Sequence, residues 1–575
     1  ILFNRVAMKK EEKSLNPQVD LFGNIAIAFS GGGYRASSFG LGVLSYLKQV
    51  QFKDKTLLEQ VKGLSTVSGG TLMGATYAYY AAKEARFESF YKDFYKVLDE
   101  DKLLGIALEK LDSDELWKTS HKRRSLINAF ALAYNELLTN EDFKFLKQHK
   151  SHLEDICFNA TDFSFGLAFR FQTTGRFGNY RLTNHYLSQL SDEMKIADAI
   201  ASSSCFPIGF EPLLMPDDYV SDHNSEVYKS IKSQPEFKNG VGIMDGGIVD
   251  NQGIGSIMNA EVRRVNEGKS YDLIMVCDVG SYNMDPWEPS EIEMVRMGWS
   301  KSPKQLFNLL VEKLKLSWWL WLPLIISFGL LVSGFMNMPS VGLFIGGGAM
   351  AMFALFAVAL KYFIGKMEEK SMRLWTWMSG MVPKFMKGKL KRFQNLKLRL
   401  IQRMIEERGT SSLIMISDIF LKQIRRLNYD LLYKDDSLKN RRITTLIYEL
   451  TKDQYQKGDS DEKEMDIKEE LINEPTELIY NAAKIACEMD TTLWFTEKDR
   501  EVLRLKNLVA CGQFTACYNL LKYCMDLKKS EANFDEILLD QMIEIFQADW
   551  NKFIKDPYFL HDYLEIEEDM LKNVG

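Results

Sequence analysis

Two segments that pass from an apolar run through small residues into a helical pattern constrain the fold of this chain most. The first joins residues 24–30 to Gly31, Gly32 and Gly33 and then to residues 36–48; the second joins residues 64–67 to Ser68, Gly69 and Gly70 and then to residues 71–83. Short apolar runs bounded by glycines are typical of buried strands, and strands that alternate with helices build an α/β sheet. Further strands are predicted at 156–159, 166–172 and 272–277. The sequence therefore predicts an α/β domain.

Length and composition narrow the class of protein. A chain of 575 residues is longer than one hydrophobic core usually supports, so two or three domains are expected. Its 46% hydrophobic and 26% charged residues are typical of a globular protein, and a net charge of −6 predicts no nucleic-acid partner. Seven scattered cysteines without a CxxC pair predict reduced thiols in the cytosol, and the first residues lack the apolar run of a secretory signal.

Two uncharged stretches predict a helical hairpin that crosses a membrane. Residues 317–336 and 341–360 contain no charged side chain, and each has about the 20 residues that a helix needs to span a bilayer. Pro339 interrupts the turn between them, and tryptophans cluster near the start of the first stretch. Lysines flank both outer ends, which predicts a multi-pass protein whose preceding domain is cytoplasmic at the plasma (inner) membrane. The alternative interpretation is a buried hairpin in a large soluble core.

A strongly basic segment follows the hairpin. Lysines and arginines interleave there with Trp375, Trp377 and Phe385, a composition that suits an anionic membrane surface, with a solvated helical face as the alternative. The predicted organisation is an N-terminal segment (1–21), an α/β domain (22–295) with a helical insertion (84–150), a connector (296–316), a transmembrane helical hairpin (317–361), basic membrane-proximal helices (362–411) and a helical C-terminal domain (412–575).

Ser68 is the candidate nucleophile. It lies on the turn between a predicted strand and helix, where a serine is lifted clear of the sheet and small neighbours such as Gly69 and Gly70 admit a strained backbone. The N-terminus of the following helix favours negative charge beside it. Thr66 stands where the usual G-x-S-x-G turn has glycine, so the strand and helix are expected to fit together somewhat differently.

The glycine loop Gly31, Gly32 and Gly33 is the candidate oxyanion hole. Consecutive glycine amides can converge on one negatively charged oxygen. A phosphate loop would need G-x-x-x-x-G-K-[ST], and no lysine followed by serine or threonine occurs at that spacing. A dinucleotide fingerprint is poorly met as well, because no suitable acidic residue ends a second strand. Arg35 follows the loop, where it either contacts a phosphate headgroup or has a structural role.

Asp245 is the candidate general base. It precedes Gly246 and Gly247, which let a neighbouring backbone approach the carboxylate closely. Histidine is the commoner base for serine, but none of the six histidines lies in a recognisable site; His185 and His223 are the best placed. A carboxylate acting directly on Ser68 is the economical alternative, and it would need a pKa raised by burial. Cys205 lacks a plausible base and is interpreted as a packed residue.

These elements, in this order, resemble the patatin-like phospholipases, in particular a bacterial-type, membrane-anchored member. The resemblance covers residues 22 to about 290 and includes the segments 158–162, 201–207 and 210–212. It implies a three-layer α/β/α hydrolase core, a Ser68–Asp245 dyad without histidine, and an oxyanion hole of Gly31, Gly32, Gly33 and Gly69. Gly70, Gly246 and Gly247 support that site, and neither a cofactor nor a metal is implied.

The expected function is a lipid acyl hydrolase of the phospholipase A or lysophospholipase type, working through an acyl-enzyme. Its expected partners are membrane phospholipid as substrate and an anionic membrane surface; the sequence leaves open whether the chain forms homo-oligomers. Two alternatives remain. The chain could be a signal-activated effector that damages membranes, or a catalytically inactive membrane scaffold.

Overall fold

A computed structural model of the chain describes residues 20–182, 185–207, 209–281, 287–289, 305, 322–336, 348, 352, 396–457, 472–530 and 532–561. The chain divides into two compact units. One comprises Ile1–Met284 together with Ile419–Gly575, and the other comprises Asp285–Asp418.

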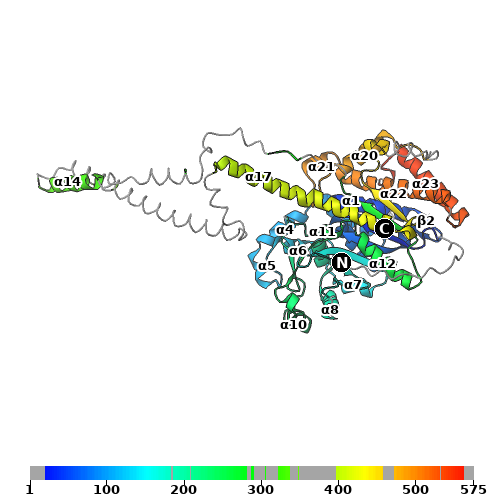
Figure 1. Cartoon of the computed structure of the whole chain (residues 1–575), viewed down its shortest axis with the longest axis horizontal. Helices are drawn as coiled ribbons and strands as arrows, with labels where there is room; N and C mark the ends of the chain where they lie inside the picture. Colours follow the sequence, from blue (N-terminus) through cyan, green and yellow to red (C-terminus); the bar gives the residue numbers. More distant parts are fainter. Residues whose placement is uncertain are drawn as a thin grey trace, which may run out of the picture. The chain divides into compact units, whose positions relative to one another are not determined.

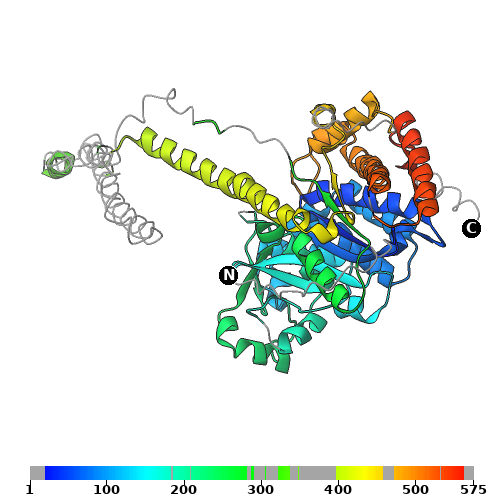
Figure 2. The same cartoon turned by 45° about the vertical axis from the view of Figure 1, so that its right-hand side comes forward.

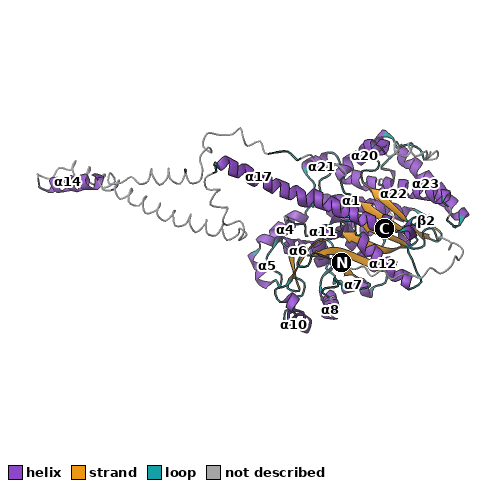
Figure 3. Cartoon of the chain, in the orientation of Figure 1, coloured by secondary structure: helices purple, strands orange, loops and turns teal. Residues whose placement is uncertain are grey.

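A mixed β-sheet lies at the centre of the first unit, between layers of helices (Figure 3). Its strand order is β10-β9-β1-β4-β5-β8-β7, and β6 pairs with β5. Neighbouring strands from β10 to β5 in this order run parallel to one another. Strands β6 and β8 each pair antiparallel with β5, and β7 pairs antiparallel with β8. The strands are β1 (Ile25–Phe29), β4 (Val61–Val67), β5 (Asp155–Asp162), β6 (Leu167–Gln172), β7 (Leu213–Met215), β8 (Val241–Asp245), β9 (Leu273–Asp278) and β10 (Arg442–Leu446). A small hairpin adds β2 (Gln51–Phe52) and β3 (Lys55–Thr56).

Side chains of β1 alternate between two hydrophobic clusters, as the period of two along a strand requires. Ile25, Ile27 and Phe29 join the cluster that contains α1 (Gly33–Gln49), α2 (Gly69–Ala82) and α22 (Arg504–Lys529). Ala26 and Ala28 join the cluster that contains α12 (Ile254–Asn266) and α18 (Leu421–Tyr433). Helices therefore cover both faces of the sheet, and the prediction of an α/β core is confirmed.

The remaining helices of the first unit surround this core (Figure 1). Residues 84–150 hold five of them: α3 (Phe87–Glu100), α4 (Leu103–Asp112), α5 (Asp114–Thr119), α6 (Leu126–Leu137) and α7 (Lys144–Gln148). The others are α8 (His185–Glu193), α9 (Ile196–Ser203), α10 (Glu226–Lys232), α11 (Gly247–Asp250), α20 (Glu477–Cys487), α21 (Glu497–Glu501) and α23 (Glu536–Lys555).

The described part of the C-terminal region differs from the separate helical domain expected at 412–575. Its strand β10 completes the parallel edge of the sheet by pairing with β9. Its helix α22 packs on α1 so closely that a Cβ on Gly42 would lie 2.0 Å from the Val509 carbonyl oxygen, and one on Gly512 would lie 2.1 Å from that of Phe39. Figure 2 shows the C-terminal helices α22 and α23, in orange and red, beside α1, in blue. The two regions share one core because their helices meet at glycines.

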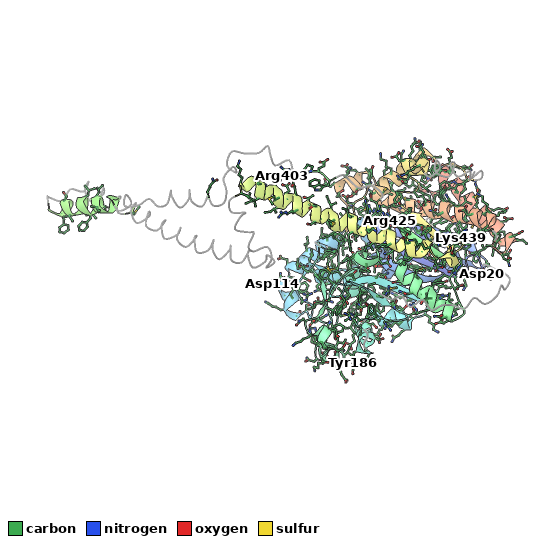
Figure 4. The ribbon with its side chains drawn as sticks, viewed as in Figure 1. Asp20, Asp114, Tyr186, Arg403, Arg425 and Lys439 are labelled. Atoms are coloured by element: carbon green, nitrogen blue, oxygen red, sulfur yellow. The ribbon has the colours of Figure 1, made fainter. Side chains whose placement is uncertain are left out.

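A buried ion pair also joins the C-terminal region to the sheet. Arg425 on α18 (Figure 4) donates from Nε to Oδ2 of Asp278 at the end of β9, over 2.7 Å. The Tyr429 hydroxyl donates to the same oxygen over 2.9 Å. Asp278 is fully buried, so removing one partner would leave an uncompensated charge.

In the second unit, the structure describes only parts of the predicted membrane segments. Helix α14 (Leu322–Met336) falls within the first apolar stretch, and α17 (Leu398–Ile414) falls at the end of the basic segment. Among the described residues, no helix combines the length and apolar character needed to cross a bilayer. Apart from residues 348 and 352, the rest of the predicted hairpin at 317–361 lies outside the described residues, as do residues 1–19 and 362–395.

Candidate active site

Ser68 occupies a strained turn between β4 and α2. Its backbone angles, φ 50° and ψ −121°, fall in a region that residues with a side chain rarely adopt. Such a conformation costs about 1–3 kcal/mol and persists where surrounding contacts hold it, which is common at catalytic turns. Ser68 is the N-cap residue of α2, so the positive end of that helix faces it. The predicted serine turn is present.

The glycine loop lies directly beside Ser68. A Cβ on Gly31 would be 3.1 Å from Cβ of Ser68, and a Cβ on Gly69 would be 2.0 Å from the carbonyl oxygen of Gly33. A Cβ on Gly70 would be 2.7 Å from the carbonyl oxygen of Ser30. The distances at Gly69 and Gly70 are shorter than a Cβ tolerates and the one at Gly31 is tight, so the glycines bring the ends of β1 and β4 into contact.

Three amides at this contact are free to bind an anion. Among the described residues, the N–H groups of Gly32, Gly33 and Gly69 have no hydrogen-bond acceptor. They lie at the N-termini of α1 and α2, whose dipoles add to their positive potential. Gly31 differs from the prediction, because its N–H donates to the Asn251 carbonyl over 2.9 Å and is not available to an oxyanion.

Replacing Gly69 with alanine is expected to lower turnover by about 100-fold or more, the typical loss when one oxyanion donor is displaced. The added Cβ would collide with the Gly33 backbone at 2.0 Å, and a backbone contact has little room to relax. The measurement is kcat, with the melting temperature as a check of folding. Gly105→Ala is the matched control, since nothing lies within 4 Å of a Cβ there. Equal turnover in both variants would contradict the assignment.

Asp245 ends β8, next to β5, and lies beside Ser68. The Gly247 N–H donates to its Oδ1 over 2.7 Å, and the Ser68 side chain lies near enough to the carboxylate to lower its pKa. Burial raises the pKa of Asp245 to about 6, and the hydrogen bonds from Gly247 and Ser68 oppose that rise. A Cβ on Gly246 would lie 2.4 Å from the Asn159 carbonyl oxygen, which explains the glycine at this position. The predicted nucleophile and base are thus in contact.

The other titratable candidates have different partners. His152 bonds the Tyr77 hydroxyl over 2.8 Å, and His223 stacks on Tyr228 with ring centroids 4.3 Å apart. The side chain of His185 lies outside the described residues. The Cys205 thiol is buried against the Glu211 carbonyl oxygen, and burial and the nearby Asp245 charge raise its pKa well above the usual range. In the described part of the chain, no group of three or more His, Cys, Asp or Glu side chains is arranged for a metal ion.

Arg35 contacts the C-terminal region of the chain. The buried guanidinium donates from Nη1 to the Met489 carbonyl over 2.6 Å. The next contact along this segment is between the Tyr34 N–H and the Thr492 carbonyl, 2.8 Å apart. Of the two roles considered for Arg35, these contacts support the structural one and not the phosphate contact. Arg35 ties the helix behind the glycine loop to residues more than 450 positions later in the chain.

Two contacts at the site had no counterpart in the sequence analysis. The Asn251 carbonyl holds Gly31, as described above, and the Ser203 hydroxyl accepts the Ser68 N–H over 2.9 Å. Ser203 lies in the segment 201–207 named above and Asn251 lies six positions after Asp245, but serine and asparagine are also common in ordinary turns. Their spacing alone gave no signal of these roles.

Comparisons with known proteins relate part of this chain to one family. Residues 27–257 match the model of a family described as patatin-like phospholipase. Among solved structures, human GIVD cytosolic phospholipase A2 is similar, with 14% sequence identity and a TM-score of 0.30 over 45% of this chain and 45% of that one. The chain therefore spans under half the length of that protein, and a search of curated protein sequences gave no match. Residues 27–257 of this chain form a patatin-like phospholipase domain.

Proposed function

We propose that this protein hydrolyses fatty-acyl esters of membrane phospholipids, with Ser68 as nucleophile and Asp245 as the single general base. The observation that carries the proposal is that the Ser68 side chain, on a strained turn beside three free amides, lies close to the buried Asp245 carboxylate. A general base must be able to reach the proton it removes, and the Asp245 carboxylate interacts with the side chain that carries this proton. Its pKa of about 6 leaves it ionised, yet basic for a carboxylate, at neutral pH.

The reaction has two acyl-transfer steps. Asp245 removes the Ser68 proton as Oγ bonds to the ester carbonyl carbon, and the amides of Gly32, Gly33 and Gly69 stabilise the oxyanion. The bond to the alcohol oxygen then breaks, and Asp245 returns the proton to that oxygen, which releases lysophospholipid. A water molecule next attacks the acyl-enzyme and gives a proton to Asp245. The fatty acid leaves as this proton passes to Ser68.

Product analysis tests this proposal. Purified protein would be incubated with vesicles of a phospholipid whose two acyl chains differ, and the products identified by mass spectrometry. Equimolar free fatty acid and lysophospholipid are expected, and the identity of the released chain gives the position cleaved. Release of phosphate or headgroup without fatty acid would contradict the proposed reaction.

A second candidate is the same enzyme held inactive until a signal arrives. The observation that favours it is the contact of the C-terminal segment with the glycine loop, where a Cβ on Gly33 would lie 2.1 Å from the Thr492 carbonyl oxygen. Any movement of that segment would change the oxyanion hole. Failure to cleave vesicles, together with rapid labelling of Ser68 by a fluorophosphonate, would favour this candidate. Absence of both reactions would instead favour a scaffold.

We also propose that residues 317–361 anchor the chain in the plasma (inner) membrane. The uncharged stretches support this, and α14 presents apolar side chains outward: Ile325 is 69% exposed and Phe335 is 87% exposed. Anchoring would hold the site near its substrate at high local concentration. The protein is expected to sediment with membranes and to resist extraction at alkaline pH without detergent. Recovery in the supernatant would contradict the anchor.

A further inference from the structure

The last turn of α9 contacts the nucleophile through one fully buried hydroxyl. Oγ of Ser203 lies 2.9 Å from the Ser68 nitrogen, 2.8 Å from Oγ1 of Thr71 and 2.6 Å from the Asn159 carbonyl oxygen. No other hydrogen bond from the described residues involves the Ser68 N–H. The strained backbone of Ser68 is therefore held through Ser203.

The direction of each hydrogen bond around Ser203 follows from proton counting. A hydroxyl has one proton to donate, and the Asn159 carbonyl only accepts, so Ser203 donates to Asn159. Thr71 must then donate to Ser203, and Thr66, whose Oγ1 is 2.9 Å away, donates to Thr71. The Ser203 oxygen accepts from Ser68 and Thr71 and donates once. Every bonding position of this oxygen is filled, which fixes it in place.

The same turn also holds the base. The Ser203 carbonyl accepts the Gly246 N–H over 3.4 Å, and the Cys205 carbonyl accepts the Asp245 N–H over 3.0 Å. The Asn159 carbonyl that receives the Ser203 proton lies against Gly246. The side chain of Ser203 thus fixes the backbone of Ser68, while the main chain of the same turn fixes the backbone that carries Asp245.

We propose that Ser203 is a positioning residue, which holds the Ser68 hydroxyl and the Asp245 carboxylate in the relative positions that proton transfer requires. This inference rests on the proposed function, because it assumes that Ser68 is the nucleophile. Ser203 has no contact with substrate in this role: it is fully buried, and its proton is committed to Asn159. Without it the Ser68 N–H loses its acceptor and the turn relaxes, and a misplacement near 1 Å costs about 100-fold in rate.

The experiment compares Ser203→Ala with Ser202→Ala in the full chain. Ser202 is the matched control because it lies on the same helix, is equally buried and makes two hydrogen bonds, to the Asp198 carbonyl and the Tyr219 hydroxyl, each over 2.6 Å. The first readout is the rate of labelling by an alkyl fluorophosphonate, in which Ser68 Oγ bonds to phosphorus, fluoride leaves and Asp245 takes the proton. The second readout is kcat and KM on phospholipid vesicles.

Ser203→Ala is expected to lower both kcat and the labelling rate roughly 10- to 100-fold with KM nearly unchanged. Ser202→Ala should stay within about threefold of wild type. Thr71→Val removes the hydroxyl that donates to Ser203 and should slow labelling. Thr71→Ser keeps that hydroxyl and should be labelled at about the wild-type rate. These two variants test the positioning role if Ser203→Ala does not fold.

Equal labelling of Ser203→Ala, Ser202→Ala and wild type would overturn the positioning role while leaving the proposed function intact. So would equal losses in both serine variants, since these would indicate lost stability alone. Labelling of Ser68→Ala at the wild-type rate would instead overturn the proposed function, and the positioning role would fall with it.

Discussion

Replacing Ser68 with alanine is expected to reduce fatty-acid release from phospholipid vesicles by on the order of 10⁵-fold, the scale of loss when a serine hydrolase loses its nucleophile. The reason is that the neighbouring side chains that the structure describes at the site are not placed to replace it. Ser203 is buried and commits its proton to Asn159, and Cys205 is buried with a raised pKa. The measurement is initial rate by mass spectrometry, with the variant's circular dichroism compared with that of wild type.

A nearby serine provides the control for this variant. Ser38 is fully buried, whereas Ser68 is only partly buried; Ser38 lies about one turn along α1 from the glycine loop, and its hydroxyl donates to the Tyr34 carbonyl of its own helix over 2.7 Å. Ser38→Ala should therefore remain within a few-fold of wild type. Residual activity of Ser68→Ala above about one per cent of wild type would rule out Ser68 as the nucleophile.

The core of the site could be predicted because its determinants are local. Strand, glycines and helix follow one another within about 25 residues in each of the segments 24–48 and 64–83. The structure places the strands of these two segments, β1 and β4, side by side. Ser68 and Asp245 are both candidates from the sequence, and the structure places their side chains close together. Because 177 residues separate the two positions, the sequence suggests this pairing only through the lack of a well-placed histidine and through the family resemblance.

The features that the sequence could not predict depend on contacts between distant segments. Arg35 was ambiguous because its partner, the Met489 carbonyl, is a backbone atom 454 positions away. Strand β10 lies among helices and is only five residues long, so it leaves no alternating pattern long enough to recognise. Gly31 was grouped with its neighbours because the sequence cannot show that the Asn251 carbonyl already binds its amide.

Replacing Asp245 with asparagine is expected to abolish activity and to stabilise the protein at the same time. The loss of the base should lower kcat by roughly 10⁴-fold, as in other serine hydrolases whose carboxylate is neutralised. Asparagine keeps the shape of the side chain and can still accept the Gly247 N–H and donate to Ser68. The gain in stability arises because the wild-type carboxylate is ionised inside the protein at neutral pH.

The dependence of this stability difference on pH follows from the raised pKa of Asp245. Folding moves the pKa of Asp245 from about 3.8 to about 6 because burial disfavours the charged form. The folded state therefore binds the proton more tightly, and this contribution to stability is complete below pH 3.8 and is lost as the pH rises through 6. A difference of about two pKa units corresponds to about 3 kcal/mol, which the variant avoids.

Asp245→Asn should accordingly unfold at a higher denaturant concentration than wild type at pH 8, and the difference should shrink toward zero near pH 4. Urea titrations at these two pH values measure it. Wild-type kcat/KM should show the matching acid limb, rising through pH 6, since only the carboxylate can accept the Ser68 proton. A stability difference that is the same at both pH values would mean that folding leaves the pKa of Asp245 at its ordinary value near 3.8. Such a carboxylate would be a weak base for the Ser68 proton, and a dyad acting without histidine would no longer explain the reaction.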